Sequence, residues 1–165
     1  LSLTRISETE LELDEIEFEE YIDEILKSLQ NYPGYEDVAF DLDIARDIGF
    51  YSDKRLLTSV LQNLIQNAIN YRNRNGVGAK TNLRIVTDTN GINIEVSDNG
   101  IGIPAKLQAK VFDMFYRANT DTSGSGLGLY IVHTAVNKLD GNIELQSEEN
   151  VGTTFSIHLP NKKAS

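Results

Sequence analysis

Cysteine and tryptophan are both absent from this chain of 165 residues. Without cysteine, the chain has no disulfide framework, no zinc site made of thiolates and no thiol nucleophile, a composition consistent with a reducing compartment. It also lacks an apolar run of the roughly 20 residues that cross a bilayer, and no charged and then apolar leader opens it. We therefore expect a soluble, cytoplasmic domain without membrane contact. Because its first residue is Leu1, we expect a piece of a longer protein, whose membrane anchor, if it has one, lies outside this chain.

Basic residues are also scarce, with 15 lysines and arginines against 25 acids and a net charge of -10. Ten of the acids lie between Glu8 and Glu24. A chain without a basic stripe cannot release phosphate counterions, so we expect no nucleic acid partner. We interpret the acidic run as the solvated face of a helix, with a docking surface as the less favoured alternative.

Hydrophobic periodicity indicates the elements of a single domain with a real core, since 40% of the residues are apolar. Alternation or helical spacing predicts strands over 11–16, 38–44 and 48–51, helices over 18–29, 53–72 and 127–139, a hairpin over 81–89 and 91–97, and a last strand pair over 142–147 and 153–159. Asn90-Gly91 is the predicted two-residue turn of the hairpin. The sum is an α+β fold, a two-layer α/β sandwich whose mixed, mostly antiparallel sheet is covered by helices on one face.

The segment LQNLIQNAIN, residues 61–70, combines an ordinary apolar helix face with an unusual row of amides. Those amides are Gln62, Asn63, Gln66, Asn67 and Asn70. Asparagine is a poor helix former, whereas an amide oxygen can bind a hard cation without adding charge. The alternative is a solvated face on which asparagines cluster by chance.

Two glycine-rich loops suggest a nucleotide. In SDNGIGIP, residues 97–104, Asp98 ends a buried strand and could accept from an exocyclic amine, which distinguishes adenine from guanine. Gly100 and Gly102 would let the backbone approach a flat ligand, although an ordinary Asp-Asn-Gly turn is the alternative. In GSGLGL, residues 124–129, glycines open a helix whose free N–H groups suit a phosphate. Its spacing is that of neither the dinucleotide fingerprint nor the P-loop.

Five motifs in this order carry a specific resemblance: NLIQNAINY (63–71), DNGIGIP (98–104), VFDMFYR (111–117), GSGLGLYIV (124–132) and GTTFSIHLP (152–160). Residues 10 to 160 resemble the catalytic ATP-binding domain of two-component sensor histidine kinases, a branch of the Bergerat (GHKL) fold shared with gyrase B and heat-shock chaperone ATPases. The resemblance implies that residues 1–8 end a dimerisation helix, 9–161 form the catalytic domain and 162–165 are a tail.

The resemblance also implies roles for individual residues. Asn67 would coordinate Mg²⁺ with support from Asn63, and Asp98 would bind the adenine amino group, directly and through a water shared with Thr153. Glycines 100 and 102 would leave the rim of the base uncrowded. Tyr71 and Ile103 would cover the faces of the ring.

Residues 116–126 would form a lid over the triphosphate, with Phe112 and Phe115 anchoring its near end. Arg117 would contact the phosphate tail, unless it is simply an exposed loop arginine. The phosphate loop itself would consist of Gly124, Gly126, Leu127, Gly128 and Leu129. Relatives often carry lysine at the position of Asn70, and Arg72 or Arg74 is a candidate to replace it.

Asn63 stands where hydrolytic members of the fold carry a glutamate base, and an amide cannot take a proton from water. The resemblance therefore implies transfer of the γ-phosphoryl group to a histidine on a dimerisation domain absent from this chain, and onward to a response regulator. His133 and His158 are expected to be structural or solvent-facing. We expect this fragment to be monomeric and the parent homodimeric. A slow ATPase and a degenerate nucleotide-binding scaffold are the alternatives.

Overall fold

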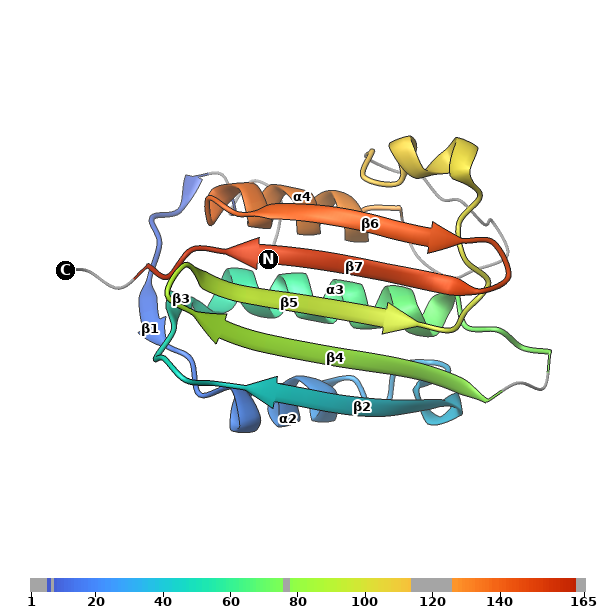
Figure 1. The fold of residues 1–165 in the computed structure, drawn as a ribbon, viewed down its shortest axis with the longest axis horizontal. Helices are drawn as coiled ribbons and strands as arrows, with labels where there is room; N and C mark the ends of the chain where they lie inside the picture. Colours follow the sequence, from blue (N-terminus) through green and yellow to red (C-terminus); the bar gives the residue numbers. More distant parts are fainter. Residues whose placement is uncertain (1–5, 7, 76–77, 114–125, 163–165) are drawn as a thin grey trace.

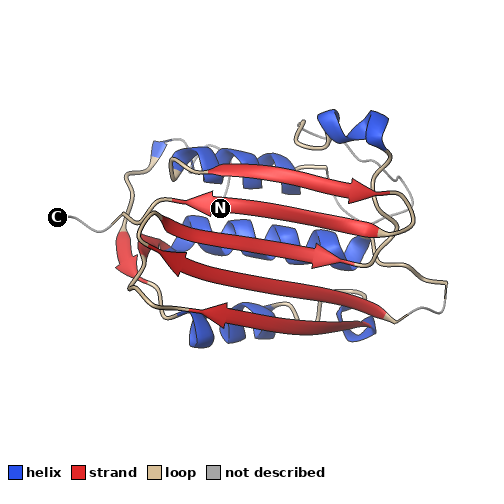
Figure 2. Cartoon of the chain, viewed as in Figure 1, coloured by secondary structure: helices blue, strands red, loops and turns tan. Residues whose placement is uncertain are grey.

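A computed structural model describes residues 6, 8–75, 78–113 and 126–162 of the chain. It has two layers, in which a five-stranded sheet is covered on one face by three helices (Figures 1 and 2). The elements are β1 (Leu13–Glu15), α2 (Phe18–Ser28), η1 (Tyr35–Asp37), β2 (Val38–Ala45), β3 (Tyr51–Asp53), α3 (Lys54–Asn70), β4 (Ala79–Asp88), β5 (Gly91–Asp98), η2 (Ala105–Lys110), α4 (Gly128–Lys138), β6 (Asn142–Glu148) and β7 (Gly152–Leu159).

The sheet has the strand order β2-β4-β5-β7-β6. Only β2 and β4 run parallel, and the other three pairs are antiparallel. A separate two-stranded sheet joins β1 to β3. The predicted α+β sandwich with a mixed, mostly antiparallel sheet is therefore confirmed.

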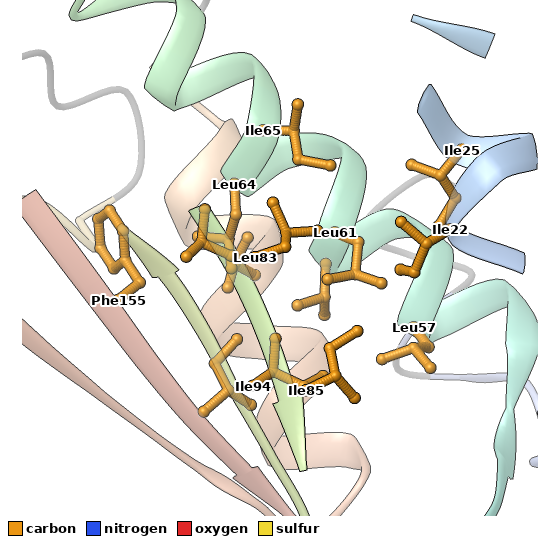
Figure 3. Packing of buried hydrophobic residues seen from close by; sticks show 14 of the residues in the cluster. Ile22, Ile25, Leu57, Leu61, Leu64, Ile65, Leu83, Ile85, Ile94 and Phe155 are labelled. Atoms are coloured by element: carbon orange, nitrogen blue, oxygen red, sulfur yellow. The ribbon is translucent and has the colours of Figure 1, made fainter. Parts of the chain in front are cut away.

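The core lies between the helices and one face of the sheet. Buried and exposed residues alternate along β4, so Leu83 and Ile85 point inward together with Ile94 of β5. They meet the apolar face of α3, including Leu57 and Leu61 (Figure 3). The amides of α3 lie outside this face and are half-buried, so the packing that holds the helix leaves them available.

Helix α3 begins where the sequence predicts, because Asp53 caps it. The Asp53 carboxylate accepts from the N–H groups of Arg55 and Leu56, at 3.0 and 3.3 Å, and its side chain is 0% exposed. It also accepts from the N–H of Glu12 at 2.8 Å and from the Arg55 guanidinium. One buried carboxylate thus joins the residue that precedes β1 to the start of the helix of amides.

Two local predictions were wrong. Asp88 pairs with Gly91, so the hairpin turn is Thr89-Asn90 and Gly91 belongs to the strand. Gly91 is needed there because a β-carbon would lie 2.1 Å from the carbonyl oxygen of Leu159, at a φ of +135°. The strand predicted over 48–51 begins only at Tyr51, and the side chain of Ile48 is exposed. No helix in the described part of the chain is long and apolar enough to span a bilayer.

Candidate functional site

Three chain segments meet at one end of the sandwich. Helix α3 ends, β5 ends and α4 begins on the same side of the molecule (right in Figure 1). The N–H of Ile101 donates to the carbonyl of Tyr71, the C-cap of α3, at 2.9 Å. The loop that follows Asp98 is thereby fastened to the end of the amide helix.

Asn63 has a defined orientation. Its Nδ2 donates to the carbonyl oxygen of Ser59, one turn earlier, at 2.7 Å. Because a carbonyl can only accept, the amide nitrogen must take this side and Oδ1 must face away. Oδ1 faces the start of α4, 3.1 Å from the point where a β-carbon on Gly128 would lie.

Asn67 lies one helical turn further along α3 and is half-buried. Its backbone carbonyl accepts from Tyr71, but its side-chain amide has no hydrogen-bond partner within the described residues. The structure therefore brings Asn63 and Asn67 to one face at the end of α3, with the oxygen of Asn67 available to a ligand.

Asn70 and Arg72 are engaged away from the amide pair. The Tyr32 hydroxyl donates to Oδ1 of Asn70 at 3.0 Å. The Arg72 guanidinium pairs with Asp37 at 2.9 Å and donates to the carbonyl of Ile69. Arg72 is therefore held by Asp37 in this arrangement, and that Arg72 or Arg74 replaces the usual lysine stays a prediction.

Asp98 ends β5, and the two oxygens of its carboxylate have different surroundings. Its Oδ1 accepts from the N–H groups of Gly100, at 2.9 Å, and Thr153, at 3.3 Å. Burial raises the pKa of this carboxyl to about 6, although the two hydrogen bonds lower it. Oδ2 accepts no hydrogen bond from the residues that the structure describes, so it is open to an outside donor.

The two glycines of this loop allow backbone to approach backbone. A β-carbon on Gly100 would lie 2.3 Å from the carbonyl oxygen of Tyr71, and one on Gly102 would lie 2.1 Å from that of Glu148. Gly102 also has a φ of +70°. Both positions thus require glycine for the loop to fit against α3 and the β6–β7 turn, a reason that the sequence did not reveal.

Three polar residues of this corner were missed by the sequence analysis: Asn99, Gln108 and Ser147. Asn99 extends the β4 ladder, since its side chain accepts from the N–H of Lys80 and donates to the carbonyl of Gly78. Gln108 donates to the carbonyls of Ile103 and Ser147, at 2.9 and 3.0 Å. The Ser147 hydroxyl accepts from the N–H of Ile103 at 2.8 Å. Of these three residues, only Asn99 could have been singled out from the sequence, because it lies inside a glycine motif.

The remaining predicted residues surround this corner. Ile103 is 4% exposed, and Tyr71 is half-buried at the end of α3. Gly126 has a φ of +79°, Leu127 is the N-cap of α4, and Gly128 and Leu129 form its first turn. Phe112 packs edge-on against Phe155, with ring centres 6.2 Å apart, and its role as a lid anchor stays a prediction. Arg117, Gly124 and Phe115 lie outside the described residues.

The two histidines lie at or near the surface of the domain. Nδ1 of His158 is 3.1 Å from the side-chain oxygen of Asn93, on the sheet face opposite the helices. His133 is exposed on α4, next to Phe112 and Asn137. Both are on or near the surface, as the sequence predicted.

Comparison with known proteins agrees with this geometry. Residues 52–163, which hold α3, the Asp98 loop, α4 and β7, match the family of histidine kinase-, DNA gyrase B- and HSP90-like ATPases. The chain belongs to this family. ATP is the nucleotide that such ATPase domains bind. The corner built by α3, β5 and α4 is the candidate for its site.

The curated proteins to which this chain is similar include histidine protein kinases. This ATPase domain is 30% identical over 154 residues to the histidine protein kinase SaeS of Staphylococcus epidermidis, covering 89% of the chain and 43% of SaeS. The chain thus spans less than half the length of the curated relatives that it matches.

Solved structures of histidine kinases have the same fold as this chain. The catalytic domain of the histidine kinase ThkA superposes with a TM-score of 0.76 at 26% identity, covering 92% of this chain and 97% of that one. Full-length ShkA in complex with AMPPNP shares the fold, with a TM-score of 0.80 at 21% identity, covering 98% of this chain and 34% of ShkA. The resemblance inferred from the five motifs is confirmed: this is a histidine kinase catalytic domain.

Proposed function

We propose that this domain binds Mg-ATP at the end of α3 and delivers the γ-phosphoryl group to a histidine on a dimerisation domain of the same protein. Asn67 would bind Mg²⁺, with Asn63 supporting, and Asp98 would accept from the 6-amino group of adenine. The parent would be a homodimer that passes the phosphoryl group to an aspartate of a response regulator, in the cytoplasm.

The observation that carries the proposal is the side-chain orientation of Asn63. Its amide is turned so that an uncharged oxygen faces the start of α4, where the γ-phosphate end of a nucleotide would approach. A glutamate there could take a proton from water, but an amide cannot. The site therefore holds and polarises ATP while lacking, at this position, the base that hydrolysis needs.

The residues present suit a magnesium nucleotide. Mg²⁺ prefers oxygen ligands and usually keeps several waters, so one amide oxygen and the phosphates are an adequate ligand set. Held by Asn67, Mg²⁺ would supply positive charge that offsets the negative charge of the phosphates during transfer. The half-buried Asn67 amide, without a partner among the described side chains, fits this role.

Transfer needs a nucleophile from outside the site. In the step that we propose, a neutral imidazole nitrogen supplies the electron pair for a new P–N bond. The bond between the γ-phosphorus and its bridging oxygen breaks, and that pair leaves with ADP. His158 lies on the sheet face opposite the helices and His133 is exposed beside Phe112, so we take both to be structural, and the acceptor would come from a dimerisation domain.

Domain boundaries form part of the proposal. Residues 9–161 would be the ATP-binding unit, 1–8 the end of the dimerisation helix and 162–165 a tail. Ile6 is 2% exposed and packs in the core, so it would anchor that helix end to the domain.

Calorimetric titration with a non-hydrolysable ATP analogue, with and without Mg²⁺, tests the binding half. We expect binding that Mg²⁺ strengthens, that a GTP analogue does not reproduce and that Asp98→Asn abolishes. The transfer half is tested by adding labelled ATP and a separately produced acceptor-helix fragment, with an acceptor His→Ala fragment as control. Label on the unsubstituted fragment alone supports transfer. Phosphate release at the same rate without either fragment would instead indicate an ATPase.

A further inference from the structure

We propose that Ser147 is a positioning residue that makes the base pocket selective for a 6-amino group, by fixing the direction of the Thr153 hydroxyl proton. The inference rests on the proposed function, because it takes Asp98 and Thr153 to be the groups that meet the base. It assigns to Ser147 a part in specificity that neither its sequence position nor the family match indicates.

Ser147 belongs to a polar row that crosses the sheet. Strand register pairs Asp98 of β5 with Thr153 of β7, and Thr153 with Ser147 of β6. The next row toward the centre of the sheet, Val96, Phe155 and Leu145, is apolar and packs in or against the core. The polar row therefore lies on the helix-facing side of the sheet, at the end where the core stops and the site begins.

The Ser147 hydroxyl has three neighbours within hydrogen-bond distance. The N–H of Ile103 donates to it at 2.8 Å. The carbonyl oxygen of Gly152 lies 2.9 Å away, and the hydroxyl oxygen of Thr153 lies 2.8 Å away.

Counting protons orients the contact with Thr153. A hydroxyl has one proton to donate and two lone pairs that accept. The Gly152 carbonyl can only accept, so its bond uses the single proton of Ser147. The contact with Thr153 must then run the other way, with Thr153 donating, and all three bonding positions of Ser147 are filled. Thr153 is 5% exposed, so solvent does not compete for its proton.

Thr153 consequently presents only lone pairs to the pocket. Its own N–H bonds the Asp98 carboxylate at 3.3 Å, so the two acceptors are neighbours. An amino group, or a water that donates to both, satisfies this pair. A base with a 6-oxo group would instead place a third acceptor next to the Asp98 carboxylate and the Thr153 hydroxyl oxygen. Binding of such a base is strongly unfavourable, because buried acceptors that face each other have no donor.

Removing the Ser147 hydroxyl frees the Thr153 proton. In Ser147→Ala, that proton can turn toward the pocket and donate to an oxo group. We expect the preference for an ATP analogue over the matching ITP analogue, which differs only by 6-oxo in place of 6-amino, to fall by about tenfold, the scale of one hydrogen bond in a buried site. Ser147→Thr keeps a hydroxyl and is expected to retain the preference.

Calorimetry with both analogues, at a pH of about 8 where Asp98 is ionised, gives the ratio of the two dissociation constants. The control is Gln108→Ala, which removes two hydrogen bonds from the same corner but leaves the three hydroxyl contacts in place. This control should lower the affinity for both analogues by the same factor and leave the ratio of the two dissociation constants unchanged. A general loss of structure raises both dissociation constants by the same factor, whereas a change in the direction of the Thr153 hydroxyl proton changes their ratio.

Several outcomes would overturn the inference: an unchanged ratio in Ser147→Ala, an equal change in Gln108→Ala, or no rescue by Ser147→Thr. If the unsubstituted domain binds neither analogue, the proposed function fails instead. If Ser147→Ala does not fold, proton NMR of the unsubstituted domain decides. A slowly exchanging Thr153 hydroxyl proton close to Ser147 supports the inference, and one that exchanges freely with water contradicts it.

Discussion

The side-chain oxygen of Asn63 lies 3.1 Å from the point where a β-carbon on Gly128 would stand, so the amide helix and the first residue of α4 are in close contact. This contact is tight because the Asn63 amide is held on its other side by the carbonyl of Ser59. The space beside Asn63 therefore depends on a glycine.

Gly128→Ala tests that contact. Alanine favours a helix over glycine by up to about 1 kcal/mol, which offsets part of the crowding, so we expect little change in the free energy of unfolding. The new β-carbon would displace the Asn63 oxygen beside the proposed nucleotide, so the affinity for an ATP analogue should fall by about tenfold. Calorimetry and urea unfolding measure the two quantities. Gly78→Ala, whose β-carbon meets nothing within 4 Å, is the matched control and should change neither.

Asn67→Ala tests the proposed metal ligand. The substitution removes an oxygen that no described side chain uses, so the fold should tolerate it, while the gain in nucleotide affinity on adding Mg²⁺ should disappear. Titrations with Mg²⁺ and with EDTA measure this gain. Gln62→Ala removes another amide of the same helix, one that reaches Ser28 on α2, and should leave the gain intact. If Mg²⁺ still raises the nucleotide affinity of Asn67→Ala, Asn67 does not bind the metal.

Asp98→Asn should stabilise the empty domain while abolishing adenine binding. In the folded state Asp98 keeps its proton up to a pH of about 6, whereas the ordinary value is 3.8. Between these pH values the folded state holds more protons than the unfolded chain, so the free energy of unfolding falls as the pH rises. Above that window the buried charge costs on the order of 1–3 kcal/mol, which the neutral amide avoids.

Urea unfolding of the unsubstituted domain and of Asp98→Asn, measured at several pH values, tests the predicted fall of the free energy of unfolding as the pH rises. The advantage of Asp98→Asn should be present at a pH of about 7 and absent at about 3.5, where both side chains are neutral. An advantage that is equal at both pH values would show that the charge of Asp98 is not its cause.

Asp53→Ala should be the most destabilising of these substitutions. Burial acts to raise the pKa of Asp53, but hydrogen bonds from the Arg55 side chain and from the N–H groups of Glu12 and Leu56 outweigh burial and lower it. Losing a helix cap and leaving a cation without its buried partner should cost about 2–4 kcal/mol, measured by urea unfolding. Asp14→Ala, on the exposed part of β1, should cost far less. At temperatures where Asp53→Ala stays folded, its affinity for ATP should equal that of the unsubstituted domain, since Asp53 lies at the opposite end of α3.

Much of the site was visible in the sequence because its signals are local. The amides at helical spacing, the Asp98 loop and the glycines before α4 are each short segments whose geometry depends on near neighbours. Gly91 shows the limit of this reasoning. In sequence it completes an Asn-Gly turn, but the close approach of Leu159, from the far end of the chain, makes it a strand residue.

Ser147 and Gln108 could not have been predicted by the same means. Their partners, Ile103 and Thr153, depend on the register between β6 and β7 and on the position of η2. A serine in an exposed strand looks the same in sequence whether its hydroxyl meets water or three protein groups. Arg72 is a similar case, since Asp37 draws it to a partner 35 residues away.

By itself the sequence determined the kind and order of the main elements, the start of the amide helix and the residue types of the nucleotide site, because alternation and helical spacing act between residues close in the chain. The tertiary structure alone decided which polar groups meet. Asp98, Thr153 and Ser147 form one row only because three strands align in one register, and Asn63 faces Gly128 only because α3 and α4 pack side by side. Hydrogen bonds are short and directional, so alignments of this kind, made across long stretches of chain, determine what such a site can recognise.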